Sequence, residues 1–382
     1  MKLNAEDWSA LTDLRHTIHQ NPELSGEEHQ TPDRILDFLQ KTPPDQLIKP
    51  LGRTGMALVY DSGQPGPTVA FRTDLDALPI AEKGQPSYAS QVDGVAHLCG
   101  HDGHMTMVTA LGLLYGRERP KKGKVVLLYQ PAEETGEGAA WVVDDPKFKE
   151  LKPDFIFGLH NLPGEPHQQV ILKEAHMNAA SKGMVVMLEG KTSHAAEPHN
   201  GNSPAAAMSK LVLGLQELVK DTARFEDFTL LTVIHAVLGR IAFGTTPGHA
   251  EVRATLRAYR DKDLDQLSQE AEALAYQLGK EYGLEIDISY REEFPAVKNS
   301  PEAFGELEKA AKAAGLEVTY KQEPYSWSED FGHYKKVAHA GFFGLGSGTD
   351  QPELHHENFD FPDKILPGGV KMYYHLAQNI LS

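Results

Sequence analysis

The segment HLCGHDGH at residues 97–104 concentrates side chains that bind transition metals. A cysteine and a histidine two residues apart supply thiolate and imidazole, and the glycines let the backbone fold tightly around an ion. A lone cysteine is more often a reduced, buried thiol, and Cys99 is the single cysteine of the chain. The three histidines and the aspartate in the same eight residues favour a metal site.

Glu133 and Glu134 form a second candidate group. They follow the apolar run at 125–130 and precede the flexible stretch TGEG. Consecutive side chains diverge in an extended chain, so one carboxylate can bind a metal ion while the other acts on water as a general base. Most adjacent glutamate pairs are solvated turns. The position at the end of an apolar run argues against that alternative here.

Further ligand-type residues follow other apolar runs. In open α/β sheets the loops beyond the carboxyl ends of the strands form the binding crevice. Singly, these residues are commonly core histidines or surface groups; jointly they give the ligand set of a dinuclear metal hydrolase. They are Asp74 and Asp76 after the run at 68–71, His160 after 154–159, His194 after 182–190, and the adjacent pair His355 and His356 near the C-terminus.

The elements that must position these residues read as an α/β domain. Short runs that are apolar on both faces, alternating with helices, predict a mostly parallel central sheet with helices on both faces. We expect strands at 56–60, 68–71, 125–130, 154–159 and 340–345, helices at 3–20, 31–40 and 103–116, and a glycine-rich turn at 344–348.

The middle of the chain has a different pattern. Between residues 182 and 290 the expected order is strand, helix, strand, strand, helix, strand, which is that of a ferredoxin-like α+β domain. We therefore predict a discontinuous catalytic metal-binding domain, 1–178 and 293–382. An inserted lid or dimerisation domain is expected at 179–292.

Composition limits the classes of function. The chain has 382 residues, of which 40% are apolar, enough for a substantial core. Lys plus Arg total 37 and Asp plus Glu total 54, and the net charge of −17 argues against nucleic-acid and anionic-membrane partners. No apolar run approaches the ~20 residues of a membrane helix, and the N-terminus lacks the layout of a signal peptide. We expect a cytoplasmic protein.

Several segments, in order along nearly the whole chain, resemble the M20 metallopeptidase family. The resemblance is to its amidohydrolase branch of hippurate hydrolases, auxin-conjugate hydrolases and N-acyl-amino-acid deacylases. The segments CGHDGH and PAEE, taken together, are highly specific for this family. The matching segments are LRHTIHQNPELSGEE (14–28), FRTDLDALP (71–79), HLCGHDGH (97–104), QPAEETGEGA (130–139), GLHNLPG (158–164), KTSHAAEPHNGNSP (191–204), SEDFGHY (328–334) and LHHENFDFPDKILPGG (354–369).

The resemblance implies two divalent metal ions per subunit. Cys99, His101 and Glu134 would hold one ion. Cys99 again, as a bridging thiolate, would hold the other with His160 and His355. Thiolate favours zinc, whereas the oxygen ligands also admit manganese or cobalt, and nickel is a further candidate.

Other roles are implied as well. Glu133 would be the general base. His194, on the lid domain, would bind substrate or stabilise an oxyanion, in a possible homodimer formed through that domain. As residues that orient ligands or contact substrate, we expect Asp74, Asp76, Asp102 and Arg257. The chain departs from the family pattern at Glu357, where a proline is usual, and at 244–249, GTTPGH, in the lid.

The predicted reaction is hydrolysis of the amide bond of an N-acyl amino acid, or of a short peptide. A dipeptidase or carboxypeptidase of the same family would break the same kind of bond, so the motifs leave that alternative open. A non-catalytic binding protein would have no need to retain Glu133 together with the complete set of metal ligands. Serine or cysteine nucleophilic catalysis would leave Glu133 and Glu134 without a role, and no GxSxG segment occurs.

Overall fold

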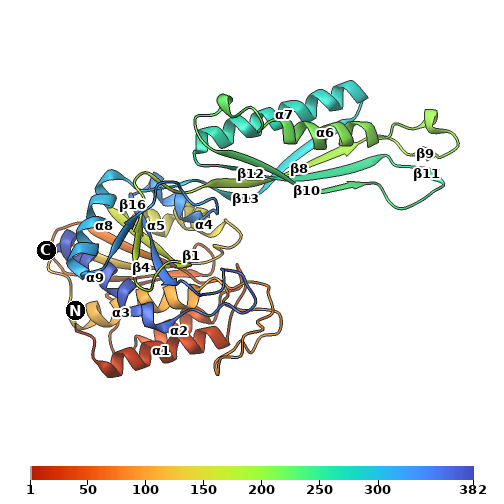
Figure 1. The fold of residues 1–382 in the computed structure, drawn as a ribbon. Helices are drawn as coiled ribbons and strands as arrows, with labels where there is room; N and C mark the ends of the chain where they lie inside the picture. The colour runs from red at the N-terminus through yellow and green to blue at the C-terminus, as the bar shows by residue number, and fades with distance from the viewer. Residues whose placement is uncertain (1) are drawn as a thin grey trace. The chain divides into compact units, whose positions relative to one another are not determined.

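The computed structural model describes residues 2–382, which form two compact units (Figure 1). Unit 1 comprises the residues up to Met177, Val297–Glu323 and Asp330–Ser382, and unit 2 comprises Asn178–Ala296 and Pro324–Glu329. The sequence predicts that residues 324–329 belong to the larger domain, 1–178 and 293–382. They group with unit 2 because the Ala179 amide donates to the Tyr325 carbonyl (2.9 Å) and Arg257 donates to the Ser326 carbonyl (3.1 Å).

An eight-stranded sheet forms the centre of unit 1. Its inner strands β4, β3, β5 and β16 run parallel, which confirms the predicted mostly parallel α/β sheet. Each inner strand is almost entirely buried, as strands covered on both faces must be. The spatial order is β1 (Gln46–Leu51), β2 (Gly55–Asp61), β4 (Lys124–Gln130), β3 (Thr68–Asp74), β5 (Phe155–Pro163), β16 (His339–Gly348), β6 (Val170–Leu172) and β15 (Val318–Tyr320).

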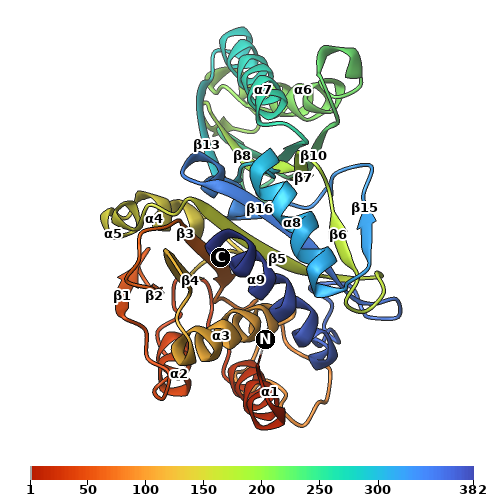
Figure 2. The ribbon, with the colours of Figure 1, turned by 90° about the vertical axis from the view of Figure 1, so that its left-hand side faces the viewer.

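Helices cover both faces of this sheet. In Figure 2, α3, α8 and α9 lie across the face nearer the viewer. Helix α3 is buried from His101 to Tyr115, as expected for a segment that is apolar nearly all round. The helices of unit 1 are α1 (Ala5–Gln20), α2 (Thr31–Phe38), α3 (His101–Arg117), α4 (Gly138–Asp144), α5 (Pro146–Leu151), α8 (Pro301–Ala314) and α9 (Leu366–Leu381).

The predicted glycine-rich turn at 344–348 is wrong, because these residues continue strand β16. Gly344 pairs with His160 and Gly346 with Leu162 of the neighbouring strand. A Cβ at Gly344 would lie 2.1 Å from a Leu162 methyl, and one at Gly346 would lie 1.9 Å from the Pro166 carbonyl. The glycines therefore allow close strand approach beside His160 instead of a change of direction.

Unit 2 has the predicted ferredoxin-like arrangement. Its four antiparallel strands lie in the order β10, β12, β8, β13, and Ala254 and Leu256 of β12 are buried while Arg253 is exposed. Helix α7 ends at Gly283, whose φ of 65° suits a left-handed cap. The elements are β8 (Ala180–Glu189), β9 (Ser193–His194), α6 (Ala205–Glu217), β10 (Thr229–Leu238), β11 (Thr245–Thr246), β12 (His249–Ala258), α7 (Asp261–Tyr282) and β13 (Glu285–Phe294).

Two short strands, β7 (His176–Asn178) and β14 (Val297–Lys298), pair where the chain leaves and re-enters unit 1. Among residues 2–382, no helix combines the length and the apolar character needed to cross a bilayer.

Candidate metal centre

Cys99 lies in the tight turn that opens helix α3. Gly100, the residue before the helix, has a φ of 95°, and a Cβ there would lie 2.4 Å from the Asn161 side-chain oxygen. Glycine is therefore needed both for the backbone and for the space. The turn brings the Cys99 sulfur to 3.3 Å from Nε2 of His160, which lies inside β5.

The two buried histidines of the cluster present one nitrogen to it and use the other for a backbone contact. Nδ1 of His101 donates to the Asp76 carbonyl (2.9 Å), and Nδ1 of His160 donates to the Asn161 carbonyl (2.8 Å). Nε2 of His101 is buried without a hydrogen-bond partner. This is the arrangement found around metal-ligating histidines, where a hydrogen bond fixes the ring and the tautomer.

Glu133 and Glu134 diverge from a turn at the end of β4. Oε1 of Glu134 lies 3.7 Å from Nε2 of His101, and Oε2 lies 3.5 Å from Nε2 of His355. Oε2 of Glu133 lies 4.0 Å from the same His101 nitrogen. Burial raises the pKa of Glu134 to about 7, although His101 opposes the shift. Glu134 Oε1 has no hydrogen-bond partner.

His355 reaches the cluster through an unusual backbone. Its φ is 65°, and its amide donates to the Leu98 carbonyl (2.8 Å), the residue before Cys99. Both His355 and its neighbour His356 are exposed, but Nδ1 of His356 accepts a hydrogen bond from the Asn358 amide whereas Nε2 of His355 faces Glu134. The structure therefore brings His355, and not His356, to the other candidate ligands.

Five predicted ligands thus lie together in unit 1. Their ligand atoms form two sets, each within 4.8 Å, that share the Cys99 sulfur: one with His101 and His160, the other with Glu134 and His355. The resemblance divided the same residues differently. Which ion each residue holds stays a prediction.

The donor set fits metal ions. Burial and the nearby Glu134 and Glu133 raise the pKa of the Cys99 thiol, so a thiolate here requires a cation beside it. Thiolate, imidazole and carboxylate are the ligands of zinc and related metals. The unpartnered His101 nitrogen and Glu134 oxygen are the atoms that such ions would bind.

The predicted orienting aspartates occupy different places. Asp76 contacts two candidate ligands, since its carbonyl accepts from His101 and its carboxylate accepts from the Glu134 amide (2.9 Å). Asp74 contacts His104 (3.0 Å) and is paired with Arg72 (2.8 Å). It lies 3.6 Å from Nε2 of His101.

The Asp102 carboxylate contacts side chains that are not candidate ligands. It accepts from Arg15 (2.8 Å) and lies 2.9 Å from Nδ1 of His19, all three side chains being fully buried. These contacts join helix α1 to the first turn of α3, which carries His101. The role of Asp102 that they indicate is to hold that turn in place.

Sequence reasoning missed the partners of these groups. His104 links Asp74 to the Asn161 side chain (2.6 Å), and Asn161 is adjacent to the candidate ligand His160. His104 lies three residues after His101 on the same helix, and this spacing is a signal that could have indicated its contact with Asp74. Arg15 and His19 offered no such signal, because they lie more than 80 residues from Asp102.

His194 and Arg257 belong to unit 2. Nδ1 of His194 accepts from the Ala196 amide (3.1 Å), so the neutral ring carries its proton on Nε2. The ring is exposed. Arg257 donates to the Ser326 carbonyl (3.1 Å) and the Ser328 hydroxyl (3.0 Å), and no carboxylate of the described residues forms an ion pair with it.

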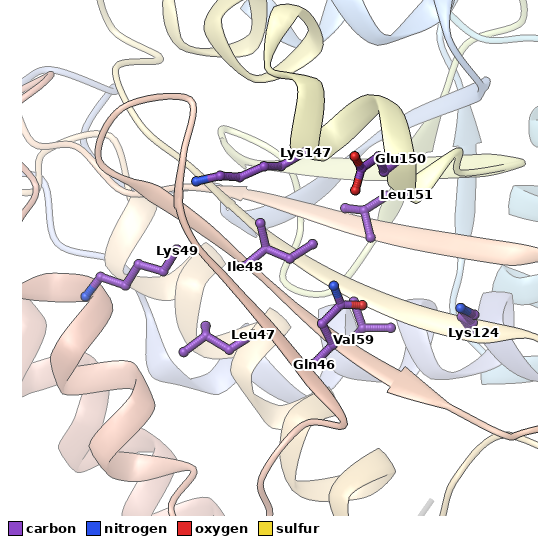
Figure 3. A pocket seen from close by; sticks show the side chains of 9 residues that line it. All are labelled: Gln46, Leu47, Ile48, Lys49, Val59, Lys124, Lys147, Glu150 and Leu151. Carbon is purple, nitrogen blue, oxygen red and sulfur yellow. The ribbon is translucent and has the colours of Figure 1, made fainter.

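A separate hollow of about 410 Å³ lies on unit 1 between β1 and α5 (Figure 3). Its three lysines are engaged: Lys49 with Asp33, Lys124 with Asp61, and Lys147 with the Pro50 carbonyl. None of the candidate ligands lines it, and we assign it no role.

The buried contact of His19 with Asp102, between helices α1 and α3, predicts that the folded protein loses stability at alkaline pH. Burial alone would lower the pKa of His19, but hydrogen bonds to Asp102 and Glu82 raise it to about 9 from an ordinary 6.5. The stabilisation is complete below about pH 6.5 and is lost as the pH rises through 9. It corresponds to about 3 kcal/mol. Urea unfolding across this range should show the decline, and His19→Gln should flatten it. A wild-type stability independent of pH between 6.5 and 9.5 would contradict the pairing.

Comparison with known proteins gives the family that the sequence motifs resemble. Residues 70–379 match the family described as Peptidase family M20/M25/M40. An N-acetyl-L-cysteine deacetylase of Bacillus subtilis is 32% identical over 376 residues, covering 97% of this chain and 88% of that protein.

Solved structures agree along the whole chain. A putative aminohydrolase from methicillin-resistant Staphylococcus aureus has a TM-score of 0.89 at 28% identity, covering 99% of this chain and 97% of the other. The Bacillus subtilis protein YXEP, described as a dinuclear metal binding peptidase, has a TM-score of 0.83 at 25% identity, with 99% of each chain covered.

Proposed function

The chain belongs to peptidase family M20/M25/M40, and on that basis we propose that it hydrolyses the amide bond of N-acyl amino acids. Membership makes it a metal-dependent hydrolase of amide bonds; the substrate class is the proposal. The observation that carries it is the cluster of Cys99, two buried histidines, Glu134 and His355 with Glu133 alongside. The deacetylase from Bacillus subtilis supports an acylated amino acid as substrate.

The ligand residues would hold two divalent ions, which when bound supply an activated water and polarise the substrate carbonyl. Glu133, only 6% exposed and hydrogen-bonded to the Asp330 amide (3.4 Å), takes the proton of the attacking water. It then delivers this proton to the leaving amine, which would otherwise depart as a poor anion.

Unit 2 is proposed as the lid and dimerisation domain. The Nε2 proton of His194 suits donation to an oxyanion. The guanidinium of Arg257, half-buried and without a carboxylate partner in the part of the chain described, suits a substrate carboxylate. Both assignments rest on donor chemistry within unit 2.

A homodimer through strand β10 is part of this proposal. β10 is an edge strand whose Ile234 and Val237 are exposed, and Ile241 and Phe243 beyond it are fully exposed. Such an edge is a template for pairing with another chain. Analytical ultracentrifugation should give twice the mass of one chain. Ile234→Lys, which places a charge on this edge, should lower the measured mass toward that of one chain.

The test of the substrate class is release of free amine from a panel of N-acyl amino acids and dipeptides. Zinc- or manganese-loaded protein is compared with a chelated sample. We expect chelator-sensitive release from the acylated amino acids. Release from dipeptides alone would contradict the proposal and indicate a dipeptidase, and release that survives complete metal removal would contradict the metal mechanism.

A further inference from the structure

The turn that carries Glu133 and Glu134 depends on an unfavourable backbone conformation. Ala132 has a φ of 49°, in the left-handed region that residues with a Cβ rarely occupy, and it is completely buried. Such a conformation persists only where the surroundings fix it. The Ala132 amide donates to Oε1 of Glu28 at 2.7 Å.

Glu28 is a fully buried carboxylate whose two oxygens have separate tasks. Oε1 accepts from Ala132, and Oε2 accepts from the Thr54 hydroxyl (2.5 Å). No lysine or arginine among the described residues forms an ion pair with it. Burying a carboxylate without a cation is costly. Burial and the nearby Asp76 raise its pKa accordingly.

The same short segment, 23–28, holds the other side of the turn. The Ser25 hydroxyl donates to Oδ2 of Asp76 (2.7 Å), and that oxygen also accepts from the Glu134 amide (2.9 Å). The Ala77 amide donates to the Glu23 carbonyl (2.9 Å), which fixes the segment beside Asp76. The backbone is thus held before Glu133 by Glu28 and after it through Asp76.

We propose that Glu28 is a positioning residue: by accepting the Ala132 amide, it sets the turn from which Glu133 and Glu134 diverge. The Glu134 carboxylate is thereby directed to the other candidate ligands, and the Glu133 carboxylate is placed next to them. This inference rests on the proposed roles of Glu133 and Glu134.

The experiment compares three variants of the full chain. Glu28→Met keeps most of the volume but cannot accept the hydrogen bond, whereas Glu28→Gln keeps an acceptor for Ala132. Glu27→Met is the matched control, because Glu27 is the exposed neighbouring carboxylate. Each metal-free protein is titrated with zinc against a competing chelator, and kcat and KM are measured on the loaded protein.

In Glu28→Met we expect zinc affinity at one site to fall by about 10- to 100-fold, with kcat falling more than KM changes. Glu28→Gln and Glu27→Met should stay within a few-fold of wild type. Equal losses in Glu28→Gln and Glu28→Met would overturn the proposal, because glutamine retains the acceptor. So would a Glu28→Met protein with lower thermal stability but normal zinc affinity and kcat, since that is a purely structural effect.

Two further variants keep the result decisive. If Glu28→Met does not fold, Thr54→Val loosens Glu28 without removing it, and we expect a several-fold loss of zinc affinity; unchanged affinity would overturn the inference. Glu134→Ala separates the inference from the proposed function. Unchanged zinc binding in Glu134→Ala would contradict the ligand assignment, whereas weakened binding there with normal binding in Glu28→Met would contradict the positioning role alone.

Discussion

Replacing Glu133 by glutamine is expected to lower kcat by about 10²- to 10⁴-fold while leaving a folded protein that still binds metal. Glutamine has the same shape, and its amide can accept the hydrogen bond that the Asp330 amide donates to Glu133. It cannot take a proton from water or deliver one to the leaving amine. Turnover on an N-acyl amino acid measures the loss, and zinc content measures what is retained.

The matched control for this change is Glu137→Gln. Glu137 is exposed and lies in the same loop, four residues further on. It should retain near-wild-type turnover, because no candidate ligand or general base is altered. Near-normal turnover in Glu133→Gln would show that the general base is another group.

The second large effect is expected from His355→Ala. Removing this imidazole takes away a proposed ligand, whose Nε2 lies 3.5 Å from Glu134 and which belongs to one of the two candidate ligand sets. We expect one of two bound ions to be lost and kcat/KM to fall by about 10³-fold or more, which corresponds to about 4 kcal/mol of transition-state stabilisation. Metal analysis together with steady-state kinetics measures both.

The adjacent histidine provides the control. The His356 side chain makes a local contact, accepting a hydrogen bond from the Asn358 amide. His356→Ala should retain both ions and most of the activity. If instead His356→Ala lost the ion and His355→Ala kept it, the assignment of His355 as the ligand would be contradicted.

The fold and the clustering of the ligands follow from local sequence signals. Apolar runs and the polar groups after them indicate the parallel strands and the edge where Asp76 and Glu134 meet. Gly283 indicates the end of α7. The prediction of a turn at 344–348 was wrong, because glycine suits both a tight turn and a close approach between strands. Only the neighbouring Leu162 and Pro166, which are distant in sequence, decide between the two.

What sequence could not give are the contacts between distant segments. Glu28 meets Ala132 across 104 positions, and Arg15 meets Asp102 across 87. Neither pair has a spacing rule, because each contact depends on how whole elements pack. The left-handed backbone at Ala132 and His355 was likewise not predictable, since alanine rarely adopts it and histidine adopts it more often but still uncommonly.

The most direct test of the two-metal site is a count of bound metal against activity. Protein stripped with a chelator is titrated with zinc or manganese, and bound metal is measured by mass spectrometry alongside amine release. The structure of the cluster predicts saturation at two ions per chain, with full activity reached only at the second. A folded chain that is fully active with one ion, or with none, would contradict the two-metal account.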